Sequence, residues 1–346
     1  MAEQAPSIID VAQHAGVSVA TVSRVLSHSS YPVSEVTRQK VLKAAAALNY
    51  TPNSLARSLR IQRSSLVAVL VGDNTDPYFA EIARGVEEVA NEHGYLTIIC
   101  NAGRDPRKEL YYLRSLQDYR IDGVIFAGSG LNIPGHIEQL QQIVQQMQKR
   151  GAKIITLSQH TLPVPSIQAD NFDGARKMTA RLIELGHQRI AFVSGPSDLL
   201  VANVRLQGYM AALVEAGYSI DPMLILPGDF THQGGEQAAN QIIHMPPEQQ
   251  PTAIFAANDE TALGILQGIA GQGRHVPVDF SVCGFGDLPL AQLMVPTLTS
   301  VHIPMRELGQ MGARYLLKLL NDEQVPLLET LPTTIIERAS TAPLHN

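Results

Sequence analysis

Few residues of this chain are of a type and spacing that could perform catalysis. Gly128-Ser129-Gly130 is too short for a dinucleotide-binding loop, and no glycine-rich turn precedes a P-loop lysine. Neither a GxSxG nucleophile elbow nor an HExxH zinc motif occurs. His160 and His187 are better interpreted as loop or capping residues than as ligands. Cys100 and Cys283 are the only cysteines and form no CxxC pair, so we expect neither a disulfide framework nor a zinc site. These observations predict a protein that is not an enzyme and has no catalytic residue, cofactor or metal.

Residues suited to nucleic-acid chemistry are instead concentrated near the N-terminus, in SIIDVAQHAGVSVATVSRVL at 7–26. Ser7 and Asp10 have capping-box spacing, and Ile8, Val11 and Ala12 then fall on one helical face. Gly16 stands where a left-handed turn is cheap. We therefore expect a first short helix that ends at this glycine.

A second helix follows directly. Ser18 can cap it, with Thr21 at the third helical position. Val22 and Leu26 face inward, which leaves a different set to face outward: Val19, Ala20, Ser23 and Arg24. This is the helix-turn-helix pattern, in which the second helix enters the DNA major groove. The alternative is a helical hairpin in an ordinary protein core.

The charge distribution favours DNA binding. Residues 1–63 hold seven basic and three acidic residues, whereas the rest of the chain holds 19 basic and 29 acidic residues. A basic head on an acidic body is typical of a DNA-binding module fused to a second function. We do not expect the acidic body to bind DNA.

The head continues with a third helix and a linker. The third helix is predicted from the Ser34 cap to Asn49, and its inner face comprises Val36, Val41, Ala44, Ala45 and Leu48. The segment 53–63 is basic and too short to form a stable helix by itself. It is interpreted as a helix that orders only on a surface, or as a plain basic linker.

From Ser65 onward, short apolar runs alternate with amphipathic stretches, which is typical of parallel α/β sheets. The runs are LVAVLV, LTIIC, GVIFAG, KIITLS, RIAFVSG, TAIFAA and SVCGFG. The spacing from Gly85 to Gly94 recurs from Gly208 to Gly217. We interpret this echo as two similar lobes with a ligand cleft between them, or as a coincidence between generic βαβ units.

The N-terminal MAEQAPS is not a signal peptide, and no apolar run approaches the about 20 residues that a membrane span needs. We expect a cytoplasmic protein without a membrane partner.

Taken together, these residues resemble the lactose/galactose repressor family of bacterial regulators. The motifs are DVAQHAGVSVATVSRVL, LNYTPNSLARSLR, DPYFAEIARGVEE, DNFDGAR, LGHQRIAFVSGP, RLQGY, AANDETALG, SVCGFGD and PTLTSVHIP. The resemblance implies an all-α helix-turn-helix head and an α/β core like periplasmic binding proteins, with two doubly wound parallel-sheet lobes. It places the DNA-binding domain at 1–52, the hinge at 53–63 and the effector-binding core at 64–346.

The resemblance also divides the core. Lobe 1 would comprise about 64–165 and 298–330, and lobe 2 about 166–297 and 331–346. Three crossings between the lobes would fall near 164–168, 296–299 and 329–333.

The resemblance assigns DNA contacts to residues of the head and hinge. Arg24 would bond guanine, worth about 1–3 kcal/mol of discrimination, while Val19 and Ala20 would contact a thymine methyl or tolerate several bases. Thr21 and Ser23 would hold phosphates. Leu59 would wedge into the minor groove at the centre of the operator. The full set is Ser18, Val19, Ala20, Thr21, Ser23, Arg24, Ala56, Arg57 and Leu59.

The effector contacts that the resemblance implies lie in the cleft. Tyr78, Phe79 and Phe230 would form aromatic walls, Arg205 would bond hydroxyls or carboxylates, and Asn258 would add a polar contact. The full set is Tyr78, Phe79, Asp173, Arg205, Phe230, Asn258 and Asp287. As alternatives, Tyr78 could be a core residue and Arg205 could pair with an acidic neighbour.

One residue departs from the family pattern. Many sugar-responsive relatives carry an aspartate where this chain has Gly286, so the family's usual acceptor of sugar hydroxyls is missing. This predicts an anionic effector, either a sugar acid, as in the gluconate-type branch, or a phosphorylated sugar. The rival is a neutral sugar held by Asp287 or Asp173.

The resulting hypothesis is a homodimeric repressor that binds a pseudo-palindromic double-stranded operator and is controlled by a small sugar-like metabolite. The residues near Phe79–Ala90 and neighbouring strands would form the dimer interface, and ERASTAPLHN lacks the heptads of a tetramer bundle. The alternative is a cytoplasmic sugar-binding protein or sugar-processing enzyme whose helical head does not bind DNA.

Overall fold

A computed structural model describes residues 6–26, 31–51 and 63–344. The chain divides into two compact units, Met1–Ser64 and Ser65–Asn346. This division falls within two residues of the predicted start of the core. We call the units the head and the core and describe each by itself.

The head contains three short helices, α1 (Ile8–Ala15), α2 (Val19–Leu26) and α3 (Glu35–Ala47). Ser7 and Asp10 form the predicted capping box, and Gly16 ends α1 with φ 65°. Ser18 Oγ accepts a hydrogen bond of 3.1 Å from the Thr21 amide at the start of α2. The predicted boundaries therefore follow from local capping chemistry.

The small core of the head is formed by alanines and valines that the three helices share. Its buried members are Val11, Ala12, Val22, Val25, Val41, Ala44 and Ala45. The prediction that Val36 faces inward is wrong, because its side chain is 68% exposed. The third helix ends at Ala47, slightly before the predicted Asn49.

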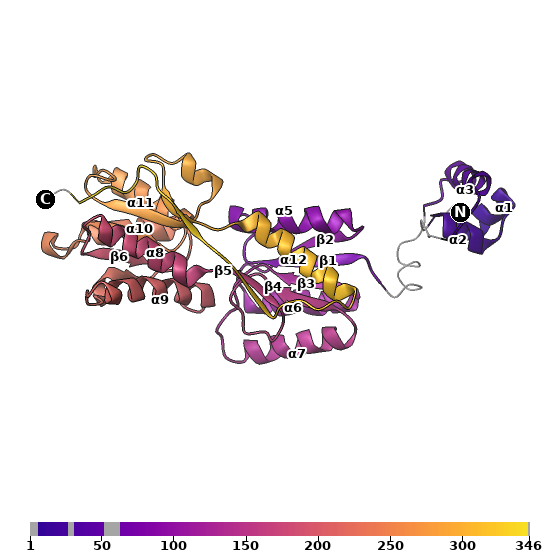
Figure 1. Ribbon diagram of the computed structural model, residues 1–346, viewed down its shortest axis with the longest axis horizontal. Helices are drawn as coiled ribbons and strands as arrows, with labels where there is room; N and C mark the ends of the chain where they lie inside the picture. The colour runs from indigo at the N-terminus through magenta and orange to yellow at the C-terminus, as the bar shows by residue number, and fades with distance from the viewer. Residues whose placement is uncertain (1–5, 27–30, 52–62, 345–346) are drawn as a thin grey trace, which may run out of the picture. The chain divides into compact units, whose positions relative to one another are not determined.

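The core consists of two lobes, each built around a six-stranded sheet and seen side by side in Figure 1. Lobe 1 has the strand order β11-β5-β4-β3-β1-β2. Its strands are β1 (Leu66–Val71), β2 (Leu96–Asn101), β3 (Gly123–Phe126), β4 (Lys153–Thr156), β5 (Ser166–Ala169) and β11 (Leu328–Leu331). Its helices are α5 (Pro77–Glu92), α6 (Pro106–Asp118), α7 (His136–Lys149) and α12 (Met305–Leu320).

Lobe 2 has the strand order β12-β10-β9-β8-β6-β7. Its strands are β6 (Ile190–Val193), β7 (Ile225–Leu226), β8 (Ala253–Ala256), β9 (Ser281–Gly286), β10 (Thr299–His302) and β12 (Thr334–Ile336). Its helices are α8 (Asn171–Glu184), α9 (Leu200–Glu215), α10 (His232–Ile243) and α11 (Asp259–Gly271), with short 3-10 turns at Pro222–Leu224, Pro247–Gln249 and Pro289–Gln292.

All strand pairs are parallel except β10 with β12. The inner strands of both sheets are buried on both faces, which explains their continuous apolar sequences. The prediction of two parallel-sheet lobes is confirmed.

The chain crosses between the lobes three times, and two of the predicted positions are wrong. β5 still pairs with β4 and β11 in lobe 1, so the first crossing follows Ala169. β10 pairs with β9 in lobe 2, so the second crossing follows His302. The third crossing falls as predicted between β11 and β12, along the yellow segment that runs through both lobes in Figure 1. The lobe boundaries near 165 and 298 move accordingly, because the crossing segments pair as strands before they leave a lobe.

The glycine echo has a packing explanation. A side chain at Gly85 would collide with the Arg306 carbonyl of α12, and one at Gly208 with the Phe172 carbonyl of α8. In each lobe this glycine therefore lets one helix pair approach backbone to backbone, and in lobe 2 Gly235 and Gly264 do the same for α10 and α11. Within residues 6–26, 31–51 and 63–344, no helix is long and apolar enough to cross a lipid bilayer.

Candidate DNA-binding surface and ligand cleft

The outward face of α2 carries the side chains predicted to meet DNA. Val19 is 42% exposed, and Ala20 and Arg24 are also exposed, whereas Thr21 and Ser23 are half-buried. The Ser18 and Thr21 hydroxyls lie 2.9 Å apart and share a hydrogen bond. This face combines small side chains with one cation, so it can approach a groove closely.

Arg24 is supported by an aromatic ring. Its guanidinium carbon lies 4.1 Å from the centre of the Tyr31 ring. Stacking occupies the face of the guanidinium and leaves its N–H edges available for a base or a phosphate. The predicted hinge contacts Ala56, Arg57 and Leu59 lie outside the described residues.

The second candidate site is a cleft between the two lobes of the core. It encloses about 90 Å³ of water-accessible space, several times the roughly 10–15 Å³ that one water requires. Five of the seven predicted effector residues line it, namely Tyr78, Phe79, Arg205, Phe230 and Asn258.

Arg205 is the only cation that reaches the cleft from lobe 2 among the described lining residues. Its side chain comes from α9 and is 6% exposed. Nε donates to Asn171 Oδ1 at 2.9 Å, and Nη1 donates to the Ala257 carbonyl at 2.5 Å. The guanidinium lies 3.9 Å from the centre of the Phe285 ring. These contacts orient the charge but do not neutralise it.

The expected alternative for Arg205, a pairing with an acidic neighbour, does not occur. Within the described part of the chain no carboxylate is in ion-pairing distance of its guanidinium. Burial lowers the pKa of Arg205 to about 10, so it keeps its charge at neutral pH. Asp259 and Asp76 offset part of this burial at longer range, but no carboxylate of the described residues contacts the guanidinium. A buried cation without a contacting anion is costly, and a bound anion would offset that cost.

Aromatic side chains form the walls of the cleft. Asp76 caps α5 by accepting from the Tyr78 amide at 2.9 Å, and this places Tyr78 and Phe79 at the carboxyl edge of the lobe 1 sheet. Their rings meet edge to face at 5.0 Å. Burial raises the pKa of Tyr78 to about 12, so its hydroxyl stays protonated. Phe230 faces them from lobe 2 with φ 65°.

Asn258 lies beside the cleft and stabilises the local structure through two hydrogen bonds. Its Oδ1 caps α11 by accepting from the Thr261 amide at 3.0 Å, and its Nδ2 donates to the Phe230 carbonyl at 3.0 Å. The side chain thus fixes the backbone of the aromatic wall. The next residue, Asp259, is fully buried and accepts from Ser300 Oγ and the Leu288 amide. Burial raises the pKa of Asp259 to about 6.

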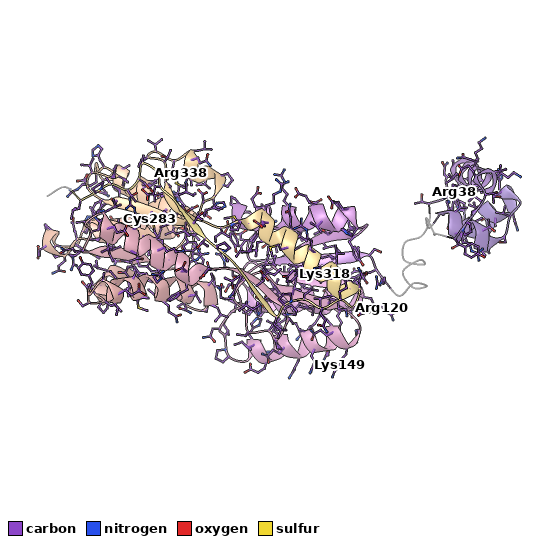
Figure 2. The ribbon with its side chains drawn as sticks, viewed as in Figure 1. Arg38, Arg120, Lys149, Cys283, Lys318 and Arg338 are labelled. Carbon is purple, nitrogen blue, oxygen red and sulfur yellow. The ribbon has the colours of Figure 1, made fainter. Side chains whose placement is uncertain are left out.

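The two predicted carboxylate acceptors lie outside the residues that line the cleft. Asp287 accepts from Arg338 at 2.7 Å and pairs with His302 at 3.0 Å, and Arg338 is labelled in Figure 2. Asp173 pairs with Lys177 at 2.6 Å and Arg176 at 2.7 Å in the first turns of α8. Hydrogen bonds from Lys177 and Arg176 lower the pKa of Asp173.

Sequence reasoning missed Arg104, which also lines the cleft. It follows β2 with φ 55°, lies 3.8 Å from Asp76, and donates a long bond of 3.5 Å to the Asp229 carbonyl of lobe 2. Its position in the loop after β2, at the carboxyl edge of a parallel sheet, could have identified it from the sequence as a candidate ligand contact. Asp105, the N-cap of α6, and Glu109 in the first turn of that helix also line the cleft, and Glu109 is bonded to His136 at 2.7 Å.

Comparison with known proteins matches both units to one family. Residues 7–53 match the family model "Bacterial regulatory proteins, lacI family". Residues 64–330 match "Periplasmic binding proteins and sugar binding domain of LacI family".

Individual relatives cover nearly the whole chain. The transcriptional repressor CytR of Escherichia coli (strain K12) is 35% identical over 93% of this chain and 92% of its own length. The structure of the Lac repressor dimer bound to operator and the anti-inducer ONPF has TM-score 0.85 at 29% identity, covering 98% of this chain and 100% of that one. The regulator CelR in complex with cellobiose has TM-score 0.71 at 32% identity, covering 97% and 99%. The chain therefore belongs to the lacI family of bacterial regulatory proteins, as a DNA-binding regulator of transcription with an effector-binding core.

Proposed function

We propose that this protein is a dimeric, cytoplasmic repressor whose affinity for a pseudo-palindromic operator is set by a sugar acid bound in the cleft. The observation that carries the effector class is the buried, unpaired charge of Arg205. The relative named with cellobiose holds a neutral sugar, so the proposed ligand differs from it in charge.

The two acidic residues expected to hold a neutral sugar are not available to one. Gly286 provides no carboxylate beside Arg205, and Asp287 and Asp173 are committed to basic partners. The rival hypothesis of a neutral sugar therefore lacks both of its proposed acceptors in this arrangement.

Other acidic residues around the cleft favour a ligand with one negative charge over a phosphate ester with two. Asp76, Asp105 and Glu109 line the lobe 1 side of the cleft, and Arg104 already lies beside Asp76. Glu260 of α11 adds to this acidic rim, since its raised pKa is caused by burial and then by Asp76. A carboxylate at Arg205 leaves the rest of the ligand free of charge near this rim.

A dimer is supported by the edge of lobe 1. β2 is an edge strand, and its Leu96 and Ile99 are 63% and 52% exposed. An apolar strand edge left in water promotes association, so a partner subunit would cover it. Two heads would then read the half-sites of a symmetric operator.

Control would pass from the cleft to the DNA through the hinge. Ligand prefers one relative arrangement of the lobes, and that arrangement sets whether the 53–63 segments order as helices with Leu59 in the minor groove. In this proposal Ala56 and Arg57 contact the same groove, and Arg24 reads a guanine in each half-site.

The test uses full-length protein and an operator selected from random double-stranded DNA. D-Gluconate and D-glucose, and D-ribose 5-phosphate and D-ribose, serve as matched charged and neutral probes in thermal-shift and operator-binding assays. Stabilisation by the sugar acid with a change in operator affinity supports the proposal. Stabilisation by neutral sugars alone would refute the anionic effector, and recovery of no palindromic sequence would refute DNA-directed regulation.

A further inference from the structure

The two lobes meet along a seam that is separate from the three chain crossings. The loop at 128–132 of lobe 1 lies against residues 198–201 of lobe 2. Leu131 and Leu199 form an isolated antiparallel bridge. The Asn132 amide donates to the Asp198 carbonyl at 2.7 Å, and the Leu200 amide donates to the Gly130 carbonyl at 3.1 Å. Ser129, Leu131, Leu199 and Val201 of this seam also line the cleft.

The seam completes the N-terminus of α9 from the other lobe. The other long helices of lobe 2 are capped by their own residues, since Asp170, Thr231 and Asn258 cap α8, α10 and α11. The N-cap of α9 is Leu199, which has no side-chain acceptor. Ser129 Oγ of lobe 1 accepts from the Val201 amide at 3.0 Å and so takes the place of the missing cap.

A second connection runs from the same region of lobe 1 to the Arg205 side chain. Ser129 Oγ is 3.3 Å from the Gln159 carbonyl, to which it can donate. Gln159 Oε1 accepts from Asn171 Nδ2 at 3.1 Å, and Asn171 Oδ1 accepts from Arg205 Nε at 2.9 Å. Asn171 is 4% exposed, so these bonds are shielded from water. Arg205 stands one helical turn after Val201 on α9.

We propose that Ser129 and Gln159 are positioning residues that hold Arg205 in its ligand-binding orientation only when the lobes are closed. Lobe 1 binds the first turn of α9 through Ser129, and it orients the guanidinium through Gln159 and Asn171. Opening the cleft breaks both sets of hydrogen bonds, so lobe closure and the orientation of the cation occur together. The functional meaning rests on the proposed role of the cleft, whereas the physical coupling does not depend on any ligand.

The first test is amide hydrogen exchange in the ligand-free, full-length protein. Ser129→Ala removes the cross-lobe cap, and Ser129→Thr keeps the hydroxyl. We expect roughly fivefold faster exchange at Val201 in Ser129→Ala, as for loss of an average helix cap, and recovery in Ser129→Thr. Ser115→Ala is the matched control, because its hydroxyl donates at 3.1 Å to Tyr111 within α6 of the same lobe. Exchange at Val201 that is unprotected in the wild type, or equal in Ser129→Ala and Ser115→Ala, would overturn the proposal.

The second test observes Arg205 directly in protein labelled with ¹⁵N-arginine. Its Nε–H signal is assigned by its loss in Arg205→Lys. We expect a slowly exchanging Nε–H in the wild type and several-fold faster exchange in both Gln159→Leu and Ser129→Ala. An unchanged Nε–H in both variants would show that lobe 1 does not position the cation.

The outcome is separable from that of the proposed function. If D-gluconate binds the wild type and both variants with equal affinity, positioning fails while the effector class stands. If no anion binds but the Nε–H signal responds as expected, the effector class fails while the coupling stands.

Discussion

Replacing Arg205 with methionine should leave the ligand-free core as stable as before, or up to about 1 kcal/mol more stable, which is unusual for a buried arginine. Burial lowers the pKa of this guanidinium from 12.5 to about 10. At 1.36 kcal/mol per pKa unit, this corresponds to roughly 3 kcal/mol paid to keep the charge in the cleft. Methionine removes that cost but leaves Asn171 Oδ1 and the Ala257 carbonyl without their donor, at about 1 kcal/mol or more each.

The chain supplies a matched control in Arg338→Met. Arg338 is similarly enclosed, with 13% of its side chain exposed, but it pairs with Asp287 at 2.7 Å. Removing Arg338 leaves the Asp287 carboxylate with only the partly exposed His302 as a partner among the described residues and should cost up to about 3–5 kcal/mol. Urea unfolding of the core, followed by circular dichroism, compares the two variants with the wild type.

A loss of more than about 3 kcal/mol in Arg205→Met, equal to the loss in Arg338→Met, would refute the claim that the Arg205 charge is unpaired. The same variant should also lose its response to the sugar acid, because the ligand's counter-charge is gone.

Three further predictions concern the head, the hinge and a buried histidine of lobe 2. Arg24→Ala should weaken binding to the selected operator by about 1–3 kcal/mol and relax preference at one base of each half-site, with the head still folded because Arg24 is exposed; unchanged preference in a binding selection would remove Arg24 from base reading. Leu59→Ala should weaken operator binding while salt-dependent binding to random DNA is kept, and equal losses on both DNAs would contradict the wedge. His187 is buried with its Nε2 3.1 Å from the Ala342 carbonyl, which can only accept, so the neutral ring carries its proton on Nε2. Burial lowers the pKa of His187 below 6.5, so the unfolded chain takes up the proton first and stability is lost as pH falls below 6.5. This slope should be shallower in His187→Gln but still present, because burial also lowers the pKa of His160; identical pH profiles would contradict the assignment.

Local chemistry explains which parts of the fold were predictable from sequence. The capping box at Ser7 and the left-handed Gly16 act within one turn, so α1 and α2 followed from adjacent residues. The buried strands of the core were visible as continuous apolar runs. The crossings at 169 and 302 were misplaced because pairing of β5 and β10 with distant strands decides where each lobe ends. Val36 was misassigned because the third helix exposes a position that its periodicity placed inside.

The residues of the cleft were predictable in part, where they belong to recognisable sequence motifs. Tyr78, Phe79, Arg205, Phe230 and Asn258 match family motifs and line the cleft together. Asp173 and Asp287 also match, but their partners Lys177, His302 and Arg338 hold them elsewhere. Sequence could not show that Arg205 lacks a carboxylate partner, nor that Ser129 caps a helix of the other lobe, since both depend on contacts between distant segments.

The central claim is that a negatively charged ligand bound at Arg205 controls the affinity of the protein for its operator. The most direct measurement is the operator affinity of the full-length protein at saturating D-gluconate and at an equal concentration of D-glucose. The account predicts a change of about 5- to 150-fold with the sugar acid alone, the range typical of allosteric coupling, and no change in Arg205→Met. An equal shift by the neutral sugar, or the same shift by the acid in Arg205→Met, would contradict it.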